Sequence, residues 1–230
     1  MTALLALHEV LRTYKERRSN RPIQALKIAS LEFARGETAA IVGPNGSGKS
    51  TLLEMLAFLR PPDQGRVVLD GHDPWLAGDP VEARRRCPLL LQRTVLFKTT
   101  VLGNVMSGLQ FRGVPRGRAR QRAEETLSQL GLAALSNRGP RELSGGERRR
   151  VALARILALA GDILLLDEPT AHVDEDNTAL IEDAIRRLHV AADGQSTVIL
   201  ATHDSQQAAR LAQRVIRLSK GEITSMQASP

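Results

Sequence analysis

The sequence has almost no cysteine and few aromatic residues. Cys87 is the only cysteine among 230 residues, which excludes a disulfide framework and a cysteine-based zinc site and favours a reducing compartment. Aromatic residues make up 3% of the chain, too few for the stacking surfaces of proteins that bind single-stranded nucleic acid. A chain of this length buries roughly 70–75% of its unfolded surface, so we expect it to fold without such covalent or metal links.

Long hydrophobic runs are also missing. Apolar runs such as Ile163–Leu166 and Val198–Ala201 span four residues, far short of the roughly 20 that a transmembrane helix needs. The N-terminal segment MTALLALHEV has neither a basic leader nor a long apolar core, so it does not resemble a signal peptide. We therefore expect a cytoplasmic protein.

Lysine is scarce, yet the chain is basic. The net charge is +7, and only five of the 32 basic residues are lysines. This excess of positive charge suits a polyanionic partner. A genomic base composition that favours arginine codons explains it equally well. The runs Arg84–Arg86 and Arg148–Arg150 are each consistent with a solvated, charged face. Charge alone therefore identifies no partner.

The first third of the chain predicts the opening of an α/β unit. Thr38–Val42 is a short apolar run that leads into a glycine-rich turn, and a helix fits Lys49–Leu59 before two prolines. Arg66–Leu69 is typical of a strand, and Leu26–Phe33 also looks extended. We expect a small antiparallel sheet beside a nucleotide-binding core.

The rest of the chain predicts helices followed by a return to strands. Helices fit Arg116–Leu130 and Gly145–Ala160. The strand pattern then resumes in three segments: Ile163–Asp167, Thr197–Ala201 and Arg214–Leu218. Apolar strands on both sides of a helical insert indicate a parallel sheet covered on both faces, with a helical subdomain inserted into it.

The segment Gly43–Ser50, GPNGSGKS, matches the phosphate-binding pattern G-x-x-x-x-G-K-[ST] between a strand and a helix. Its glycines let backbone N–H groups turn toward phosphate oxygens, Lys49 adds a cation for the β- and γ-phosphates, and Ser50 offers a hydroxyl to Mg²⁺. The predicted nucleotide-binding residues here are Gly43, Pro44, Asn45, Gly46, Ser47, Gly48, Lys49, Ser50 and Thr51.

A second motif, ILLLDE at Ile163–Glu168, places two carboxylates at the C-terminal end of a buried strand. Ligands bind at that edge in open α/β sheets. Asp167 suits Mg²⁺, through water, and Glu168 suits a general base that polarises the attacking water.

The third motif is LSGGE at Leu143–Glu147. Ser144 and Glu147 form a capping box, so a helix begins at Gly145. Glycine at both Gly145 and Gly146 costs roughly 2 kcal/mol of helix propensity, and the bare N–H groups suit a second phosphate group. The chain thus has two phosphate-binding motifs for one nucleotide.

These three motifs, in this order, resemble the ATP-binding-cassette (ABC) ATPases from end to end. The resemblance implies a P-loop NTPase (RecA-like) α/β core with a small antiparallel β-subdomain and an inserted helical subdomain, in a single ABC ATPase domain. Residues 1–92 and 158–230 would form the core with its β-subdomain, and 93–157 the helical subdomain. Two cassettes would pair head to tail, so that Ser144, Gly145, Gly146 and Glu147 of one close on the ATP of the other.

The resemblance also implies roles for four residues outside the motifs. Tyr14 would stack on adenine, although simple surface packing also explains an exposed tyrosine. Gln92 would reach Mg²⁺ and the water, Asp174 would lie in the loop that crosses the dimer interface, and His203 would contact the γ-phosphate. The implied catalytic residues are Glu168, His203 and Gln92, the implied metal ligands Ser50, Gln92 and Asp167, and the implied cofactors ATP and Mg²⁺.

Among ABC proteins, the segments QRTVLFKTTVLGNVMSGLQFRGVP and THDSQQAARLAQRV most resemble importer cassettes for oxyanions of the tungstate and phosphate type. The expected partners are a second cassette, a membrane permease that holds the chain at the inner face of the membrane and, indirectly, a solute-binding protein. We expect the Gln92–Gly113 loop to dock on the permease, and expect no nucleic acid. The alternative is a non-transport ATPase that acts as a nucleotide-gated binding or regulatory module.

Overall fold

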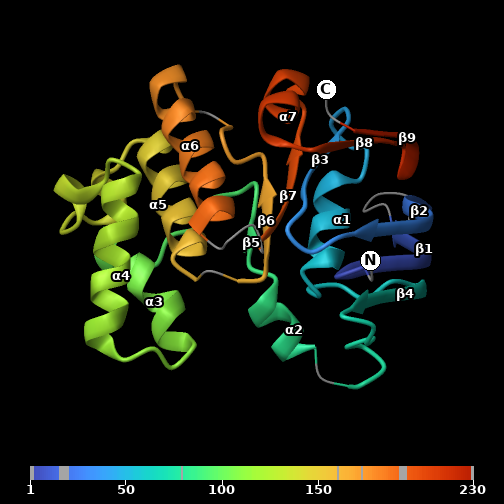
Figure 1. The fold of residues 1–230 in the computed structure, drawn as a ribbon, viewed down its shortest axis with the longest axis horizontal. Helices are drawn as coiled ribbons and strands as arrows, with labels where there is room; N and C mark the ends of the chain where they lie inside the picture. The colour runs from blue at the N-terminus through green and yellow to red at the C-terminus, as the bar shows by residue number, and fades with distance from the viewer. Residues whose placement is uncertain are drawn as a thin grey trace.

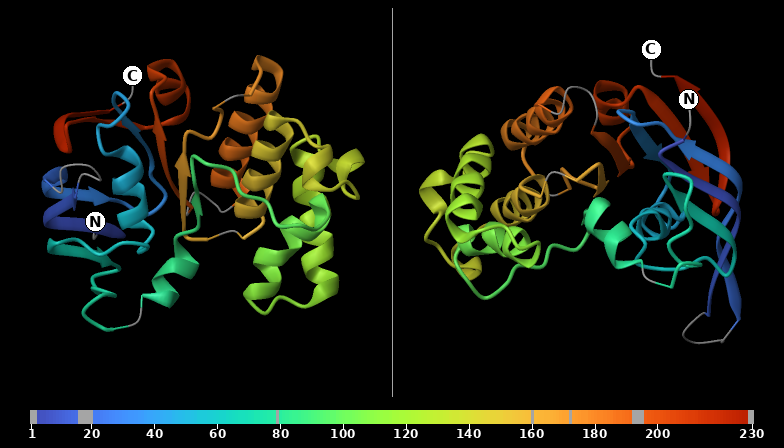
Figure 2. Two further views of the ribbon diagram at one scale, coloured as in Figure 1. Left: turned by 180° about the vertical axis from the view of Figure 1, so that it is seen from behind. Right: turned by 60° about the horizontal axis from the view of Figure 1, so that its bottom comes forward.

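Two β-sheets and a separate group of helices build the molecule (Figure 1). The computed structural model describes residues 3–15, 21–78, 80–159, 161–171, 173–191 and 196–228. Helix α1 (Lys49–Leu56) lies between the two sheets, and the helices α3 to α6, within residues 101–191, gather at the other end of the molecule, as two further views show (Figure 2).

The smaller sheet is antiparallel. Its strand order is β2 (Pro22–Phe33), β1 (Leu5–Lys15), β4 (Gln64–Leu69). The expected small antiparallel sheet is therefore present, and both predicted strands belong to it. The central strand, β1, was not among the predicted strands.

The larger sheet has the order β5 (Leu89–Leu90), β6 (Ile163–Asp167), β7 (Thr197–Thr202), β3 (Thr38–Val42), β8 (Arg214–Ser219), β9 (Glu222–Ala228). Only β9 runs antiparallel to its neighbour. All residues of β3, β6 and β7 are buried, as expected of parallel strands that are covered on both faces.

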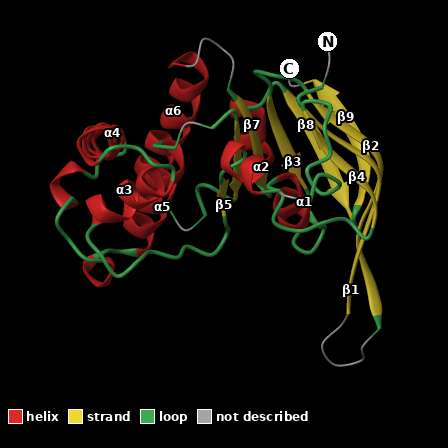
Figure 3. Ribbon diagram, turned by 90° about the horizontal axis from the view of Figure 1, so that it is seen from below, coloured by secondary structure: helices red, strands yellow, loops and turns green. Residues whose placement is uncertain are grey.

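Alternate residues of these strands enter two different cores. Ala40, Leu166 and Leu200 belong to the cluster that the helices share. Ile41 and Leu165 belong to a second cluster, with helix α1 (Lys49–Leu56) and the smaller sheet. The larger sheet is thus the middle layer of the molecule, with α3 to α6 on one side and α1 with the smaller sheet on the other (Figure 3).

The helical group contains α3 (Val101–Phe111), α4 (Arg116–Gln129) and α5 (Gly145–Leu157), which pack on one another. Short 3₁₀ turns, Ala133–Leu135 and Pro140–Glu142, join α4 to α5. The other helices are α2 (Val81–Arg86), α6 (Glu175–Ala191) and α7 (Ser205–Leu211). The Gln92–Gly113 segment is not a loop throughout, because half of it forms α3. No helix in the described ranges has the length and hydrophobicity needed to cross a membrane.

Two predicted helix ends are wrong. Helix α1 ends at Leu56, three residues before the expected Leu59, because Phe58 takes a left-handed backbone conformation (φ 55°) that buries its ring completely. Helix α5 ends at Leu157, and Ala160, the expected end, lies outside the described residues.

Candidate nucleotide-binding site

A cleft of about 370 Å³ lies at the C-terminal ends of β3 and β6. This volume falls in the usual range for small-molecule sites. The cleft is lined by predicted residues from the glycine-rich loop, from β6 and from two other segments: Tyr14, Asn45, Gly46, Ser47, Gly48, Lys49, Ser50, Thr51, Gln92, Asp167 and Glu168. Three residues of β2 that the sequence analysis missed, Ile23, Gln24 and Ala25, complete the lining.

The loop between β3 and α1 depends on its glycines. A Cβ atom on Gly43 would lie 2.2 Å from the carbonyl oxygen of Leu218, so no other residue fits there. Gly48 has φ +105°, and its Cβ would lie 2.6 Å from the Ala25 carbonyl oxygen. The sequence therefore fixes a tight turn that presents backbone N–H groups to the cleft.

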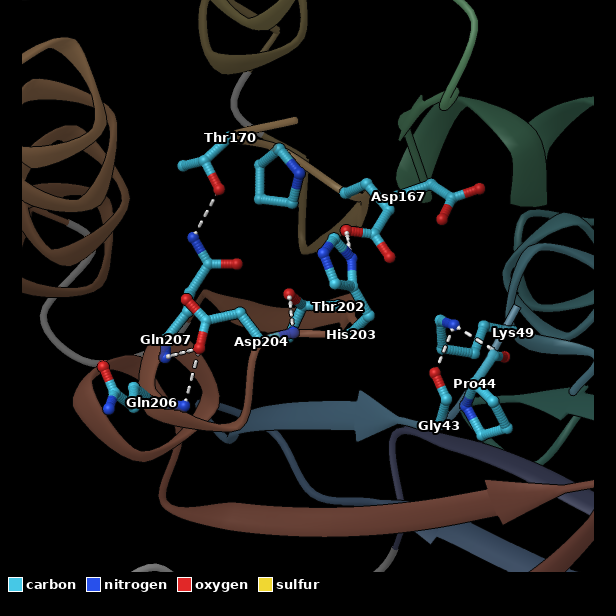
Figure 4. Close-up of polar contacts among 12 residues, drawn as sticks. Gly43, Pro44, Lys49, Asp167, Thr170, Thr202, His203, Asp204, Gln206 and Gln207 are labelled. Carbon is cyan, nitrogen blue, oxygen red and sulfur yellow. Dashed lines mark hydrogen bonds and ion pairs between the residues drawn. The ribbon is translucent and has the colours of Figure 1, made fainter. Parts of the chain in front are cut away.

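Lys49 is the first residue of α1, and its side chain is buried. Its ammonium group donates to the carbonyl oxygens of Gly43, at 2.7 Å, and Pro44, at 3.2 Å (Figure 4). The cation therefore lies across the base of the loop. Ser47 adds a buried hydroxyl with no hydrogen-bond partner among the described residues, which makes that group available to a ligand oxygen.

Asp167, at the end of β6, is 3% exposed and lines the cleft together with Ser50. Its Oδ1 atom is buried with no partner in the described part of the chain. Burial raises the pKa of the Asp167 carboxyl above its usual range, because the charged form loses its hydration. An unpartnered acceptor beside a hydroxyl is the donor set expected of a divalent-cation site that is completed by water and phosphate.

Glu168 follows directly, with a buried side chain and a left-handed backbone (φ 50°). Its Oε2 atom lies 2.8 Å from Nδ1 of His203, at the end of β7. The His203 side chain is 67% exposed, so the imidazole lies between this carboxylate and solvent. A left-handed conformation costs a non-glycine residue free energy, so the surrounding structure must hold Glu168 in it.

The remaining predicted residues do not line the cleft. Ser144 and Glu147 form the expected capping box: Ser144 Oγ accepts from the Glu147 N–H at 3.1 Å, and Glu147 Oε2 accepts from the Ser144 N–H at 2.6 Å. Ser144 and Gly145 are exposed at the start of α5. Asp174, exposed before α6, accepts hydrogen bonds from Asn177, which lower the pKa of its carboxyl.

Tyr14, near the end of β1, is partly exposed at the rim of the cleft. Two guanidinium groups lie near its ring, Arg12 at 5.2 Å and Arg60 at 5.9 Å from the centroid. Arg12 is itself held by Asp63 at 2.6 Å. These contacts hold the ring at the mouth of the cleft. The predicted position of Tyr14 at the nucleotide site is therefore consistent with the structure.

The expectation of a solvated Arg148–Arg150 face is wrong for two of its three residues. Arg148 is exposed, but Arg149 and Arg150 are 3% and 9% exposed. Arg150 donates to the Leu130 carbonyl oxygen at 3.0 Å. Burial lowers the pKa of Arg149, whose guanidinium lies behind the cleft. A short charged run in a sequence gives no sign of such burial.

With this geometry in place, comparison with known proteins defines the class. Residues 26–171 match the family described as ABC transporter, which is more than half of the chain. The chain therefore belongs to the ABC transporter family. It is an ATPase cassette of that family, and the expected P-loop fold is confirmed.

Two relatives and one solved structure illustrate the similarity. The phosphate import ATP-binding protein PstB 2 of Natronomonas pharaonis is 44% identical over 86% of this chain and 72% of its own length. The sulfate/thiosulfate import ATP-binding protein CysA of Thermosynechococcus vestitus is 40% identical over 87% of this chain, which spans 58% of that relative. A dimeric, post-hydrolysis structure of the ATP-binding cassette MJ0796 with ADP and Pi superposes with a TM-score of 0.86 at 32% identity, over 98% and 99% of the two chains.

Proposed function

We propose that this chain is the ATP-hydrolysing subunit of an importer for an inorganic oxyanion such as phosphate or tungstate. The main observation in support of an ATPase site is that the Gly43–Ser50 loop, Asp167 and Glu168 line the same cleft. The relatives named as phosphate and sulfate/thiosulfate importers support the oxyanion class.

In this proposal the phosphates of ATP lie along the glycine-rich loop. Lys49 then exchanges its contacts with the Gly43 and Pro44 carbonyl oxygens for phosphate oxygens. The N-terminus of α1, with its unpaired N–H groups, adds roughly half a positive charge. Tyr14 would stack on the adenine at the cleft rim.

The donor set fits Mg²⁺. The buried, unpartnered Oδ1 of Asp167, the neighbouring Ser50 hydroxyl and the Gln92 amide at the cleft wall are oxygen donors of the type that Mg²⁺ prefers. When bound, the ion would neutralise phosphate charge. No group of three or more His, Cys, Asp or Glu side chains in the described chain forms a metal cage, which agrees with an ion held jointly by protein and phosphates.

We assign the proton transfer to Glu168. As a carboxylate it would accept a proton from the attacking water, and its buried position would keep it free of competing solvent. His203, at 2.8 Å, would orient that carboxylate and contact the γ-phosphate from the solvent side.

The exposed Ser144–Glu147 capping box and Asp174 would act on a second cassette. These residues lie away from the chain's own cleft, so they suit the nucleotide of a partner. The dimeric structures of a similar cassette support a two-fold pair, in which both sites form together. A permease would hold this pair at the membrane and receive solute from a solute-binding protein.

Substitution of Glu168 by Gln tests the assignment. The variant should lose about 10²–10⁴-fold in hydrolysis rate, the usual worth of a general base. It should also form an ATP-loaded dimer, because the amide removes one negative charge that faces each γ-phosphate. Phosphate release and size-exclusion chromatography, with ATP and with or without Mg²⁺, measure both effects.

Lys49→Ala is the matched control. It removes phosphate binding itself, so it should give neither turnover nor a dimer. If Glu168→Gln remains monomeric with ATP and hydrolyses it at the normal rate, both the base assignment and the two-cassette arrangement are wrong.

A further inference from the structure

The guanidinium of Arg149 is buried behind the cleft without an ion-pair partner in the part of the chain that the structure describes. A buried cation in an apolar setting is costly unless its hydrogen bonds are satisfied. All three of its nitrogen atoms donate, chiefly to backbone carbonyl oxygens. A cation that binds only carbonyl and hydroxyl oxygens serves to hold chain segments in place.

One side of the guanidinium holds the segment that contains Gln92. Nη1 donates to the carbonyl oxygens of Leu91, at 2.6 Å, and Gln92, at 3.0 Å, and to the Thr94 hydroxyl at 3.3 Å. These contacts fix the backbone from which the Gln92 side chain reaches the cleft wall.

The other side holds the end of β6. Nη2 donates to the carbonyl oxygens of Asp167 and, at 2.7 Å, of Glu168, and Nε donates to that of Pro169 at 3.3 Å. The Glu168 N–H is bonded to the Ala201 carbonyl oxygen at 2.9 Å. The N–H and the carbonyl group of Glu168 are therefore both hydrogen bonded. These two bonds stabilise its left-handed backbone conformation, which is unfavourable for a non-glycine residue.

We propose that Arg149 is a positioning residue for ATP hydrolysis: its planar guanidinium fixes Glu168 and Gln92 at one mutual spacing. This inference rests on the proposed roles of Glu168 and Gln92. Arg149 contacts neither the glycine-rich loop nor Lys49 in any described hydrogen bond, so it acts on turnover and not on nucleotide binding. It lies in the second turn of α5, and that helix carries it to the back of the cleft.

The experiment compares Arg149→Gln, Arg149→Lys and Arg148→Gln. The last is the matched control, because it removes an exposed guanidinium one residue away. Affinity for ATP without Mg²⁺, steady-state kcat and KM, and thermal unfolding are measured on each full-length variant.

For Arg149→Gln we expect kcat to fall about 100-fold, as misplacement of a reacting group by about 1 Å produces, with ATP affinity within about threefold. Lysine keeps the charge but lacks the planar fork that reaches both segments, so Arg149→Lys should recover only part of the loss. Arg148→Gln should match the unmodified protein.

Three results would overturn the inference. The first is a loss of kcat in Arg149→Gln that is fully explained by a smaller fraction of folded protein. The second is a weakening of ATP binding in Arg149→Gln as large as its loss of kcat. The third is full recovery of kcat in Arg149→Lys, which would mean that the positive charge suffices. Glu168→Gln separates this inference from the proposed function. If it keeps full turnover, the assignment of Glu168 fails, whereas if it loses turnover and Arg149→Gln does not, the Arg149 inference alone fails.

Discussion

At the scale of single residues, Tyr14 lines the cleft, and the guanidinium groups of Arg12 and Arg60 lie near its ring. Tyr14→Ala should weaken ATP binding by about 1–3 kcal/mol, the worth of one base–aromatic stack, and should leave GTP similarly weak. Titration calorimetry measures both. Unchanged affinity would mean that another residue stacks on the base.

Asp167 illustrates the cost of a functional carboxylate. Burial raises the pKa of this carboxyl in the folded state. Above the unfolded pKa of about 3.9, the folded chain therefore binds more protons than the unfolded chain. As a result, the stability of the fold decreases as the pH rises through the folded-state pKa. Without nucleotide or Mg²⁺, Asp167→Asn should therefore melt roughly 2–4 °C higher at neutral pH, and ATPase activity should be lost.

The pH dependence provides the internal control. The gain in melting temperature of Asp167→Asn should shrink as the pH is lowered toward the unfolded pKa, because the native carboxyl then becomes neutral too. A difference that stays constant between acidic and neutral pH, or a less stable variant, would contradict a burial penalty on this group.

At the scale of elements, the start of α3 is held by a fully buried asparagine. Asn104 accepts from the Phe97 N–H at 2.8 Å and donates to the carbonyl oxygens of Phe97, Thr99 and Thr100. Asn104→Ala should lower the free energy of unfolding by about 1–3 kcal/mol, because it leaves buried polar groups unpaired. Urea denaturation measures this loss.

Gln110→Ala, exposed on the same helix, is the control and should change stability by less than about 0.5 kcal/mol. Limited trypsin digestion adds a local readout, since Asn104→Ala should speed cleavage after Lys98 more than at other sites. Equal effects of the two substitutions would mean that Asn104 does not hold this loop.

At the scale of the whole molecule, the expected docking segment divides in two. Val101 and Leu109 are buried within the helical group, whereas Val95, Phe97 and Phe111 are 59%, 47% and 78% exposed. Packing inside the helical group thus accounts for part of the segment. We propose the exposed part as the permease-facing surface, and residues 93–157 as the unit that carries it.

A cysteine at Lys98 tests this surface. Thr100 is a poorer position, because its hydroxyl caps α3 by accepting from the Gly103 N–H. The native Cys87 is buried, which raises the pKa of its thiol to about 12, so the new thiol is the reactive one. In membranes of the source cell we expect cross-links from Lys98→Cys to a permease subunit, and cross-links only within the chain would contradict docking.

The sequence by itself determined the parts of this protein that depend on short-range geometry. The Gly43–Ser50 loop, the strand Ile163–Asp167 and the capping box at Ser144 are each specified by neighbouring residues, through glycine conformations, β-branched and apolar runs, and hydrogen bonds across one helical turn. Local patterns were enough to predict these features with their boundaries, although Gly43 and Gly48 are also required by the close approach of Leu218 and Ala25.

Only the tertiary structure decided where distant segments meet. The β2 residues in the cleft, the early end of α1 at Phe58 and the burial of Arg149 all depend on partners far away in the sequence. The burial of a single arginine leaves no signal in the hydrophobic pattern, because its neighbours in the sequence are the same whether it faces solvent or five carbonyl groups. The packed fold alone makes that choice, since it alone brings the carbonyl groups of Gln92 and Glu168 to the same guanidinium.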